Sequence, residues 1–258
     1  MSFNHPVLVY HKVDYKVEWG FTRIHPNAFR RQIKYLHEHN YKFVTVSELI
    51  NASRSDKVVA ISFDDAYQSA YTHAYPILKE INTPATIYVI TDYVGKDNRW
   101  DLNVGNILFQ HISWEELQEL ADNGWEIGSH TLSHRDLRKL EINDIKREFV
   151  ESKELLESKL DIVVKSISFP FGKFGRRELE TAKAIGYVNS VVNYPIFNHF
   201  KEEHELFIVK RLGVYLWDTK IFFKFKLSNG IPKLLEILKQ NLLNLFSSIT
   251  IFAQGLRK

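Results

Sequence analysis

The chain has 258 residues, a length that suits one large domain or two small ones. Hydrophobic residues make up 45% of it and the net charge is +3, which argues against global disorder and against a nucleic-acid-binding protein. There is no cysteine, so a disulfide scaffold and a zinc–thiolate site are both excluded.

Short apolar runs alternate with amphipathic patterns along the whole chain. In chain order, the pattern predicts a strand at 7–10, a helix opened by Pro26, a strand at 41–44, a short helix capped by Ser47, a strand at 58–63, a helix at 71–81 and a strand at 85–90. It then predicts an irregular loop at 93–111, a helix capped by Ser113, a strand at 125–128, a helix at 142–160, a strand at 166–169, a helix at 178–185 and a strand at 187–192. This alternation indicates a parallel α/β architecture.

A carboxylate pair and two histidines are the most informative residues in the chain. Asp64 and Asp65 directly follow the predicted strand 58–63, and His130 and His134 follow the strand 125–128. One carboxylate and two imidazoles can hold a divalent ion and leave coordination sites open for water and substrate, with one acid to spare. Helix spacing cannot bring these residues together, whereas the carboxyl-terminal rim of a (β/α) barrel can.

Each half of this pattern also has a purely structural interpretation. An acidic pair after a strand can cap the next helix, and two histidines four residues apart can be capping or surface residues. The combination of both halves is far more specific than either one. It is strengthened by Pro170, Phe171 and Gly172, which follow another predicted strand.

These residues resemble the motifs of the polysaccharide deacetylases, also called NodB-homology or carbohydrate esterase family 4 domains. The family motif T/S-F-D-D is matched by Ser62-Phe63-Asp64-Asp65, and H-[ST]-x-x-H is matched by His130-Thr131-Leu132-Ser133-His134. The motif R-x-P-Y-G is matched in part by Ser168-Phe169-Pro170-Phe171-Gly172. The segment Tyr10-His11-Lys12-Val13 is similar to the start of a subgroup that deacetylates exopolysaccharides such as poly-N-acetylglucosamine. The resemblance covers residues 5 to 215.

The resemblance implies a distorted (β/α)7 barrel that hydrolyses an acetamide on a sugar. It implies a divalent metal ion held by Asp65, His130 and His134, with zinc expected and cobalt or nickel also compatible with this ligand set. Asp64 is then the general base that takes a proton from the attacking water. The backbone N–H of Phe171, between Pro170 and Gly172, is the expected oxyanion donor.

The chain departs from the family pattern in ways that leave the general acid open. Ser168 stands where many members carry an arginine that orients the catalytic aspartate, and the late histidine motif is absent. His11 is our leading candidate for the acid or for an orienting role, with His199 and His204 as alternatives.

Two further residues have open roles. Arg211 is expected to bind a substrate hydroxyl or to hold Asp64, with a surface position as the alternative. Trp100, in the loop 93–111, is expected either to stack on a sugar ring or to pack within the loop.

The sequence changes character after the catalytic region. We therefore divide it into a NodB-like domain at 1–220 and an amphipathic helical extension at 221–258. The extension either packs across the barrel or lies in a membrane surface with its lysines outward. Because the N-terminus has neither a basic nor a long apolar segment, we expect no signal peptide and a cytoplasmic protein, at the inner face of the membrane if the extension touches it.

The sequence thus predicts a metal-dependent carbohydrate N-deacetylase that acts on an N-acetylated carbohydrate in a polysaccharide, oligosaccharide or glycolipid. One alternative is a hydrolase of another C–N amide or of an O-acetyl ester, since the same residues serve either reaction. The other is a catalytically silent carbohydrate-binding protein, which the missing acid and arginine motifs keep open.

Overall fold

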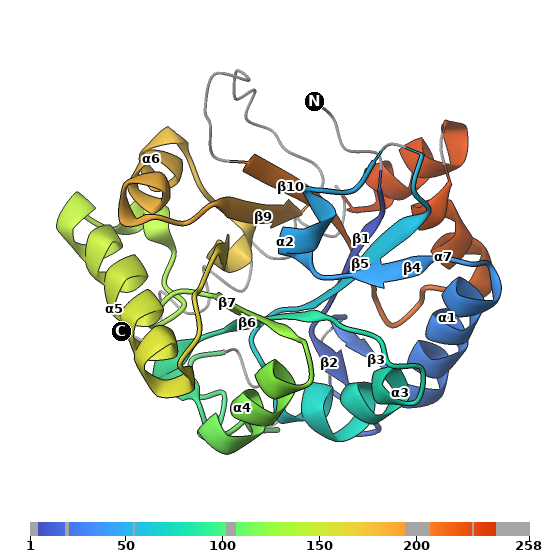
Figure 1. Cartoon of the computed structure of the whole chain (residues 1–258), viewed down its shortest axis with the longest axis horizontal. Helices are drawn as coiled ribbons and strands as arrows, with labels where there is room; N and C mark the ends of the chain where they lie inside the picture. The colour runs from blue at the N-terminus through green and yellow to red at the C-terminus, as the bar shows by residue number, and fades with distance from the viewer. Residues whose placement is uncertain are drawn as a thin grey trace.

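The computed structural model describes residues 5–18, 21–53, 55–101, 107–193, 207–228 and 230–240. Its centre is a closed barrel of seven parallel strands surrounded by helices (Figure 1). The strands run around the barrel in the order β1, β10, β9, β8, β7, β6, β5, and the pairing of β1 with β5 closes the ring. The expected (β/α)7 barrel is therefore confirmed.

The ten strands of the described part are short. They are β1 (Val7–Tyr10), β2 (Lys12–Val13), β3 (Arg23–Ile24), β4 (Lys42–Val44), β5 (Val58–Phe63), β6 (Thr86–Val89), β7 (Glu126–Ser129), β8 (Ser166–Ser168), β9 (Asn189–Asn193) and β10 (Phe207–Gly213). Strand β4 pairs with the first half of β5, and β6 pairs with the last two residues of β5. Strand β4 therefore extends the sheet without being part of the closed ring. Strands β2 and β3 form a separate pair beyond β1.

The helices cover the outside of the barrel. They are α1 (Pro26–Glu38), α2 (Val46–Leu49), α3 (Tyr75–Lys79), α4 (Trp114–Asp122), α5 (Ile142–Leu160), α6 (Arg176–Ile185) and α7 (Lys220–Leu227), and residues 231–240 form one more helix. A π-helical turn at Ala70–Ala74 leads into α3, and a 3₁₀ turn at Pro170–Gly172 follows β8. Most of the predicted elements lie close to these bounds, and α5 has the predicted bounds.

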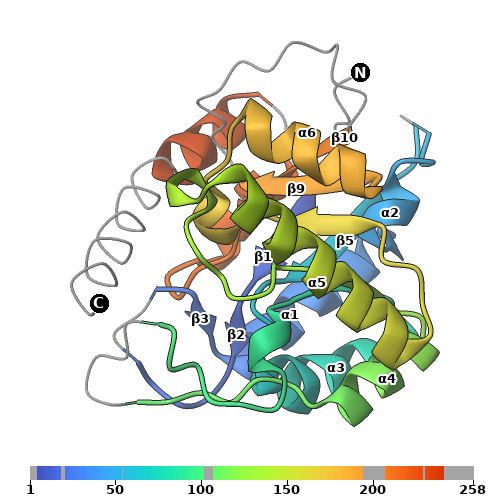
Figure 2. The same cartoon turned by 90° about the vertical axis from the view of Figure 1, so that its left-hand side faces the viewer.

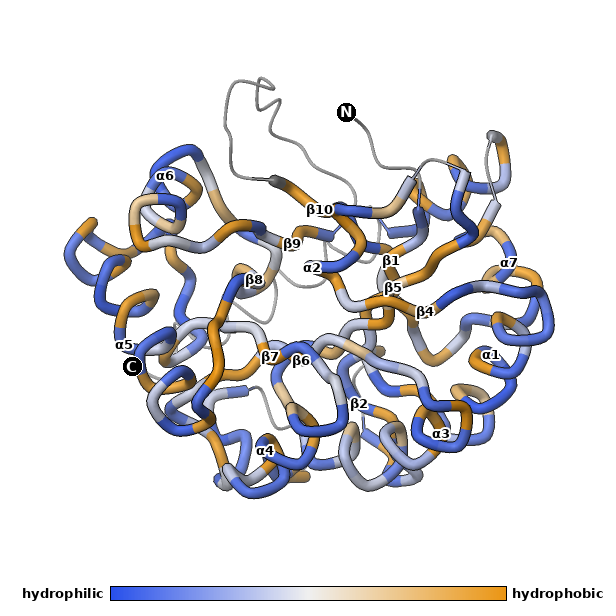
Figure 3. Tube along the Cα trace, in the orientation of Figure 1, coloured by the Kyte–Doolittle hydropathy of each residue, from blue (hydrophilic) through white to orange (hydrophobic). Residues whose placement is uncertain are grey.

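Alternating residues of the strands serve two separate apolar cores. Val7, Ala60, Tyr88, Val191 and Val209 point into the barrel and pack on one another. The residues between them pack outward against the helices in a larger cluster. Because both faces are buried, β1 and β5 read as continuous apolar runs, and Figure 3 shows them in the hydrophobic colour near the centre.

The amino-terminal end of the barrel is closed by α2, and here one prediction was wrong. Thr45, not Ser47, caps this helix, in a capping box with Glu48. Ser47 lies inside the helix, where its hydroxyl donates to Glu126 at the start of β7, and Thr86 donates to the same carboxylate at 3.0 Å. The hydroxyl that looked like a cap therefore ties α2 to the barrel.

The structure adds elements that the sequence pattern did not predict, namely β2, β3 and β10. It describes the extension as α7 and the helix 231–240, and residues 241–258 lie outside the described part. Among the described residues, none of the helices combines the length and the apolar character that crossing a bilayer requires.

Gly128 on β7 lies where a side chain has no room. A Cβ atom there would meet the Tyr88 ring at 2.6 Å and the Ser166 carbonyl oxygen at 3.1 Å. We expect Gly128→Ala to lower the free energy of unfolding by about 1–3 kcal/mol, because overpacking forces the ring or the backbone to move. Denaturant unfolding of this variant, alone and combined with Tyr88→Ala, measures the effect. An equal penalty in both backgrounds would contradict the proposed clash with the ring.

Candidate active site

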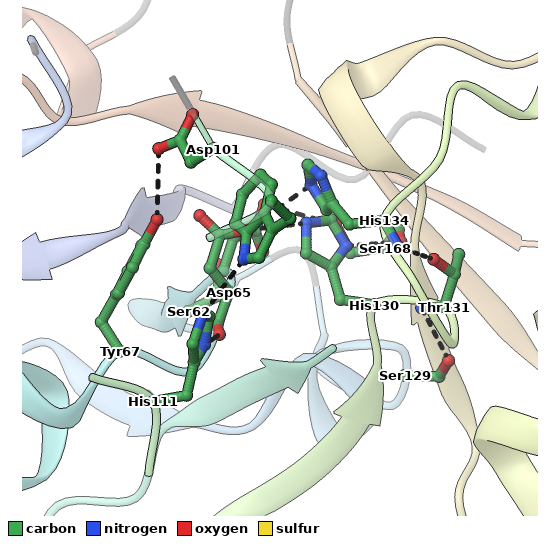
Figure 4. A network of polar contacts seen from close by, with 12 residues as sticks. Ser62, Asp65, Tyr67, Asp101, His111, Ser129, His130, Thr131, His134 and Ser168 are labelled. Carbon is green, nitrogen blue, oxygen red and sulfur yellow. Dashed lines mark hydrogen bonds and ion pairs between the residues drawn. The ribbon is translucent and has the colours of Figure 1, made fainter. Parts of the chain in front are cut away.

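The predicted metal ligands meet at the carboxyl-terminal rim of the barrel, as the strand ends require. Asp65 follows β5, and His130 and His134 follow β7, two strands further along the ring. Their donor atoms all lie within 4.8 Å of one another, and all three residues are buried. Figure 4 shows the two imidazoles side by side next to Asp65.

The spacing of these atoms fits a shared metal ion. The Oδ1 atom of Asp65 lies 3.3 Å from Nε2 of His130 and 3.5 Å from Nε2 of His134. Tetrahedral ligands placed 2.0–2.1 Å from zinc are separated from one another by roughly 3.3–3.4 Å. Asp65 Oδ1 is also buried without a hydrogen-bond partner among the described residues. A bound cation would coordinate this oxygen and so satisfy it.

The hydrogen bond on the far side of His130 fixes which nitrogen faces the site. Nδ1 of His130 donates to the backbone carbonyl of Ser168 at 2.7 Å, so Nε2 presents its lone pair to Asp65 in the neutral ring. Burial lowers the pKa of His130, but the carboxylates of Asp64 and Asp65 outweigh this effect and hold the pKa above its ordinary value. Oδ1 of Asp65 and Nε2 of the neutral His130 ring are both acceptors and face each other. They therefore attract a positive charge, either a proton or a metal ion.

The other two ligands are held in the charge states that metals bind. Burial and the neighbouring His130 lower the pKa of His134 to about 3, so its imidazole is neutral. Burial raises the pKa of Asp65, but the surrounding histidines outweigh it and hold the pKa far below its usual range. The site therefore offers the ionised carboxylate of Asp65 and the neutral imidazole of His134 as ligands.

Backbone strain is concentrated at this rim. In the part of the chain that the structure describes, eight non-glycine residues have positive φ. Three of them, Asn40, Asn82 and Asp161, lie at helix ends, where Asn and Asp tolerate this conformation. The other five lie in the loops of the site and are Asp65, Ala66, Thr131, His134 and Phe171. Such conformations cost about 1–3 kcal/mol each and persist where surrounding contacts enforce them, which is typical of functional sites.

Asp64 is not among the three ligands, and Arg211 holds its carboxylate. Nη1 and Nη2 of Arg211 donate to Oδ1 and Oδ2 of Asp64, each at 2.7 Å, and the arginine is 2% exposed. Burial raises the pKa of Asp64, but the charge of Arg211 outweighs it and the net shift is downward. The surface position considered for Arg211 is wrong, and its predicted pairing with Asp64 is confirmed.

Ser168 completes this arrangement on the opposite side of the barrel. Its hydroxyl accepts from Nη2 of Arg211 at 3.0 Å and donates to Oδ2 of Asp64 at 3.3 Å. The serine replaces the arginine that the family motif carries at this position. The guanidinium reaches the same aspartate from β10 instead.

Phe171 lies at the rim beside the metal ligands. It adopts φ 60° within the turn Pro170–Gly172, and its ring packs edge-on against His134 with centroids 4.6 Å apart. The turn follows β8 directly, so it is held next to the end of β7 by the pairing of these strands. The role of its N–H as oxyanion donor stays a prediction.

His11 follows β1 and is half-buried. Burial lowers its pKa, although the nearby carboxylates of Asp65 and Asp64 act in the opposite direction. The imidazole thus lies near the acidic pair, and its role as general acid stays a prediction. The alternatives, His199 and His204, lie outside the described residues.

His111 was not predicted as a site residue, yet it links Trp100 to the candidate metal ligand Asp65. Trp100 Nε1 can only donate, and it donates to Nε2 of His111 at 3.1 Å. Nδ1 of His111 therefore carries the proton, and it donates to the backbone carbonyl of Asp65 at 2.7 Å. Burial lowers the pKa of His111, which favours this neutral form.

The same contacts place Trp100 against the site. Its ring lies 4.1 Å from that of His134, between centroids, and it is half-buried. The predicted loop packing is thus present, and stacking on a sugar stays a prediction. No periodicity marked His111 in the sequence, because it lies in the irregular loop before the helix capped by Ser113.

Comparisons with known proteins agree with this geometry. A family model described as polysaccharide deacetylase matches residues 51–190. YxkH of Bacillus subtilis is 29% identical over 195 residues, covering 74% of this chain and 64% of YxkH. The poly-beta-1,6-N-acetyl-D-glucosamine N-deacetylase of Staphylococcus aureus is 32% identical over 176 residues, covering 62% of this chain and 57% of its own length. The chain thus spans less than two thirds of the length of both relatives.

A solved structure supports the fold. The deacetylase PplD of Streptococcus pyogenes, in complex with acetate, aligns with a TM-score of 0.74 and 22% identity, over 87% of this chain and 98% of PplD.

Removing Arg211 should destabilise the protein through Asp64. We expect Arg211→Met to lower the free energy of unfolding by about 3–5 kcal/mol, because it leaves a buried carboxylate without its partner. The penalty should shrink in an Asp64→Asn background, where no charge is left unpaired. Denaturant unfolding of the single and double variants measures the penalty of Arg211→Met with Asp64 present and with Asp64 replaced by Asn. Arg176→Met, at an arginine that is 65% exposed, is the matched control, and a similar small effect at both arginines would contradict the expectation.

His111 should support metal binding without being a ligand. We expect His111→Phe to keep the stacking on Tyr67 but to weaken zinc binding roughly 10–100-fold, because the carbonyl of Asp65 and the indole of Trp100 lose their partner. Competition with a chromophoric zinc chelator measures the affinity, with His37→Phe on the exposed side of α1 as control. Equal affinities in both variants would show that His111 does not orient the ligands.

Proposed function

Because the chain belongs to the polysaccharide deacetylase family, whose model matches more than half of it, we propose that it is a metal-dependent hydrolase that removes N-acetyl groups from an acetamido sugar. The single observation that carries this proposal is a carboxylate, Asp64, held by Arg211 beside a buried group of three metal ligands. Such a pair of a base and an open metal site suits hydrolysis, whereas a protein that only binds sugar has no need of the base.

We propose zinc as the ion, held by Asp65, His130 and His134. One carboxylate and two imidazoles suit zinc, and cobalt or nickel fit the same donors. When bound, such an ion polarises the acetyl carbonyl and lowers the pKa of water from ~15.7 to about 7.

The reaction splits an amide and consumes one water, giving acetate and a free amine on the sugar. We assign to Asp64 the removal of a proton from the attacking water. Arg211 keeps Asp64 ionised and fixes the direction of its carboxylate, so the base is in the accepting form before substrate arrives. We assign to the N–H of Phe171 a hydrogen bond to the oxygen that gains charge, and His11 is our candidate for giving a proton to the leaving amine.

The relatives support the class of substrate. The Staphylococcus aureus relative acts, by its name, on poly-beta-1,6-N-acetyl-D-glucosamine. We therefore propose an N-acetylated glucosamine unit within a polysaccharide, oligosaccharide or glycolipid as the substrate. Trp100 is half-buried next to His134, and we assign to it a contact with a sugar ring.

The test is acetate release from N-acetylglucosamine oligosaccharides by zinc-loaded protein. We expect Asp64→Asn to keep one metal per chain and to lose roughly 10²–10⁴-fold in rate, because it removes only the base. His134→Ala should lose the metal together with the activity. Metal content and acetate are measured on the same samples.

The outcomes separate the alternatives. Equal metal loss in both variants would contradict our division of roles. Turnover of acetyl esters but not of acetamido sugars would assign the site to an esterase. Sugar binding without turnover, unchanged by a chelator, would indicate a silent binding protein.

A further inference from the structure

The helix 231–240 is inverted relative to the usual pattern of a surface helix. Its polar residues Glu236 and Gln240 are 1% and 0% exposed and face the barrel. Four of its apolar residues face outward, with Ile231 74%, Leu234 55%, Leu235 50% and Leu238 54% exposed, whereas Ile237 packs on the core. A helix on a globular protein normally turns its apolar stripe toward the core, so this orientation requires an explanation.

An ionic cluster holds the polar side of this helix against the barrel. Lys226 of α7 pairs with Glu236 and, at 3.1 Å, with Asp218, and all three side chains are fully buried. Nζ of Lys226 and Nε2 of Gln240 each donate to the carbonyl of Gly213 at 2.8 Å. Glu236 is thus held by buried ion pairs and Gln240 by a donated hydrogen bond, and the helix cannot roll its leucines inward without breaking them.

The outward residues belong to a part of the chain that is rich in exposed apolar side chains. Of the fourteen exposed large hydrophobic residues among those described, eight lie between Leu216 and Leu238. We call these eight the C-terminal apolar face, and they are Leu216, Trp217, Ile221, Phe222, Ile231, Leu234, Leu235 and Leu238. Figure 2 shows the red helix 231–240 on the same side as β2 and β3, opposite α2, and so at the active-site end of the barrel. An apolar concentration of this kind marks an interaction surface.

The charges around this face favour an anionic partner. Between residues 216 and 258 the only acidic residues are Asp218 and Glu236, and both are buried in the ionic cluster. The same segment carries seven basic residues. Lys226 and Lys239 pair with the two buried carboxylates, whereas Lys220 and Lys224 are exposed. A second copy of the chain would bring lysine against lysine, whereas an anionic lipid surface attracts them.

The sequence extends the apolar stripe beyond the described helix. Apolar residues continue at the same helical spacing at Leu242, Leu245, Phe246, Ile249 and Phe252. The spacing predicts that the apolar stripe continues into this segment. An apolar stripe opposite a polar face that carries lysines is the pattern of a helix that lies in a bilayer surface.

We propose that the C-terminal apolar face binds the surface of an anionic lipid bilayer. The leucines enter the boundary between headgroups and acyl chains, and the lysines contact the headgroups. The ionic cluster fixes the face to β10, so binding presents the active-site end of the barrel to the membrane. The cytoplasmic side expected from the sequence stays a prediction.

Vesicle flotation of the full chain tests this proposal. We expect the protein to float with vesicles of phosphatidylcholine and phosphatidylglycerol, to bind less to phosphatidylcholine alone and to be released as salt rises. Leu234→Gln combined with Leu238→Gln should reduce the bound fraction by at least about tenfold, because two exposed leucines lose their burial in lipid. The matched control is Val163→Gln with Val188→Gln, at valines 72% and 52% exposed elsewhere on the protein, and it should float like the unaltered chain.

Each other outcome would overturn the proposal. Failure of the unaltered chain to float with anionic vesicles, or equal flotation of all three proteins, would exclude lipid binding through this face. A dimer in light scattering that the leucine variant dissociates, without flotation, would assign the face to a second copy. Melting curves confirm that each variant is folded. The assay reads binding alone, so its result is independent of whether the protein releases acetate.

Discussion

The ion pair between Arg211 and Asp64 is the contact on which the rest of the site depends. Arg211 lies on β10 and Asp64 follows β5, and β1 lies between them in the ring. The pair can form only because β1 joins both neighbours and closes the barrel. Barrel closure thus has a chemical consequence, since it delivers the guanidinium of Arg211 to the carboxylate next to the candidate metal ligands.

The ion pair with Arg211 affects both the charge of Asp64 and its strength as a base. The guanidinium holds the pKa of Asp64 below its usual value, which keeps the carboxylate ionised but makes it a weaker base. An unpaired buried carboxylate would instead take up a proton and lose the accepting form. A weak base in the correct form is useful only if the water it serves is itself made acidic, which is what a bound divalent ion supplies. The ion pair and the metal group are therefore complementary parts of one site.

Much of the fold and the metal group could be predicted because the signals were local. The strands buried on both faces read as apolar runs, and α5 had its predicted bounds from periodicity alone. The ligands lie in short motifs at strand ends, where the geometry of parallel strands brings them together. Ser47 was misread because a serine before apolar residues resembles a cap, and only the tertiary structure shows its bond to Glu126.

The missed features depend on contacts between distant parts of the chain. Strand β10 was not predicted as a strand because Lys210 and Arg211 interrupt its apolar pattern, and burial of an arginine is explained only by the aspartate it meets. His111 lies in an irregular loop, and its importance comes from a backbone carbonyl 46 residues away. The sequence predicted an amphipathic extension but not which face turns inward, since burial of Glu236 depends on Lys226.

Strand β10 connects the active site with the C-terminal helices. Its residue Arg211 holds the catalytic candidate Asp64, and its last residue, Gly213, accepts hydrogen bonds from Lys226 and Gln240 of the C-terminal helices. Buried ion pairs are costly to break singly, so they fix geometry more firmly than apolar packing alone. The helices therefore cannot shift outward without pulling on the strand that positions Asp64. The inverted orientation of the helix 231–240 and the alignment of the active site are for this reason two results of the same set of contacts.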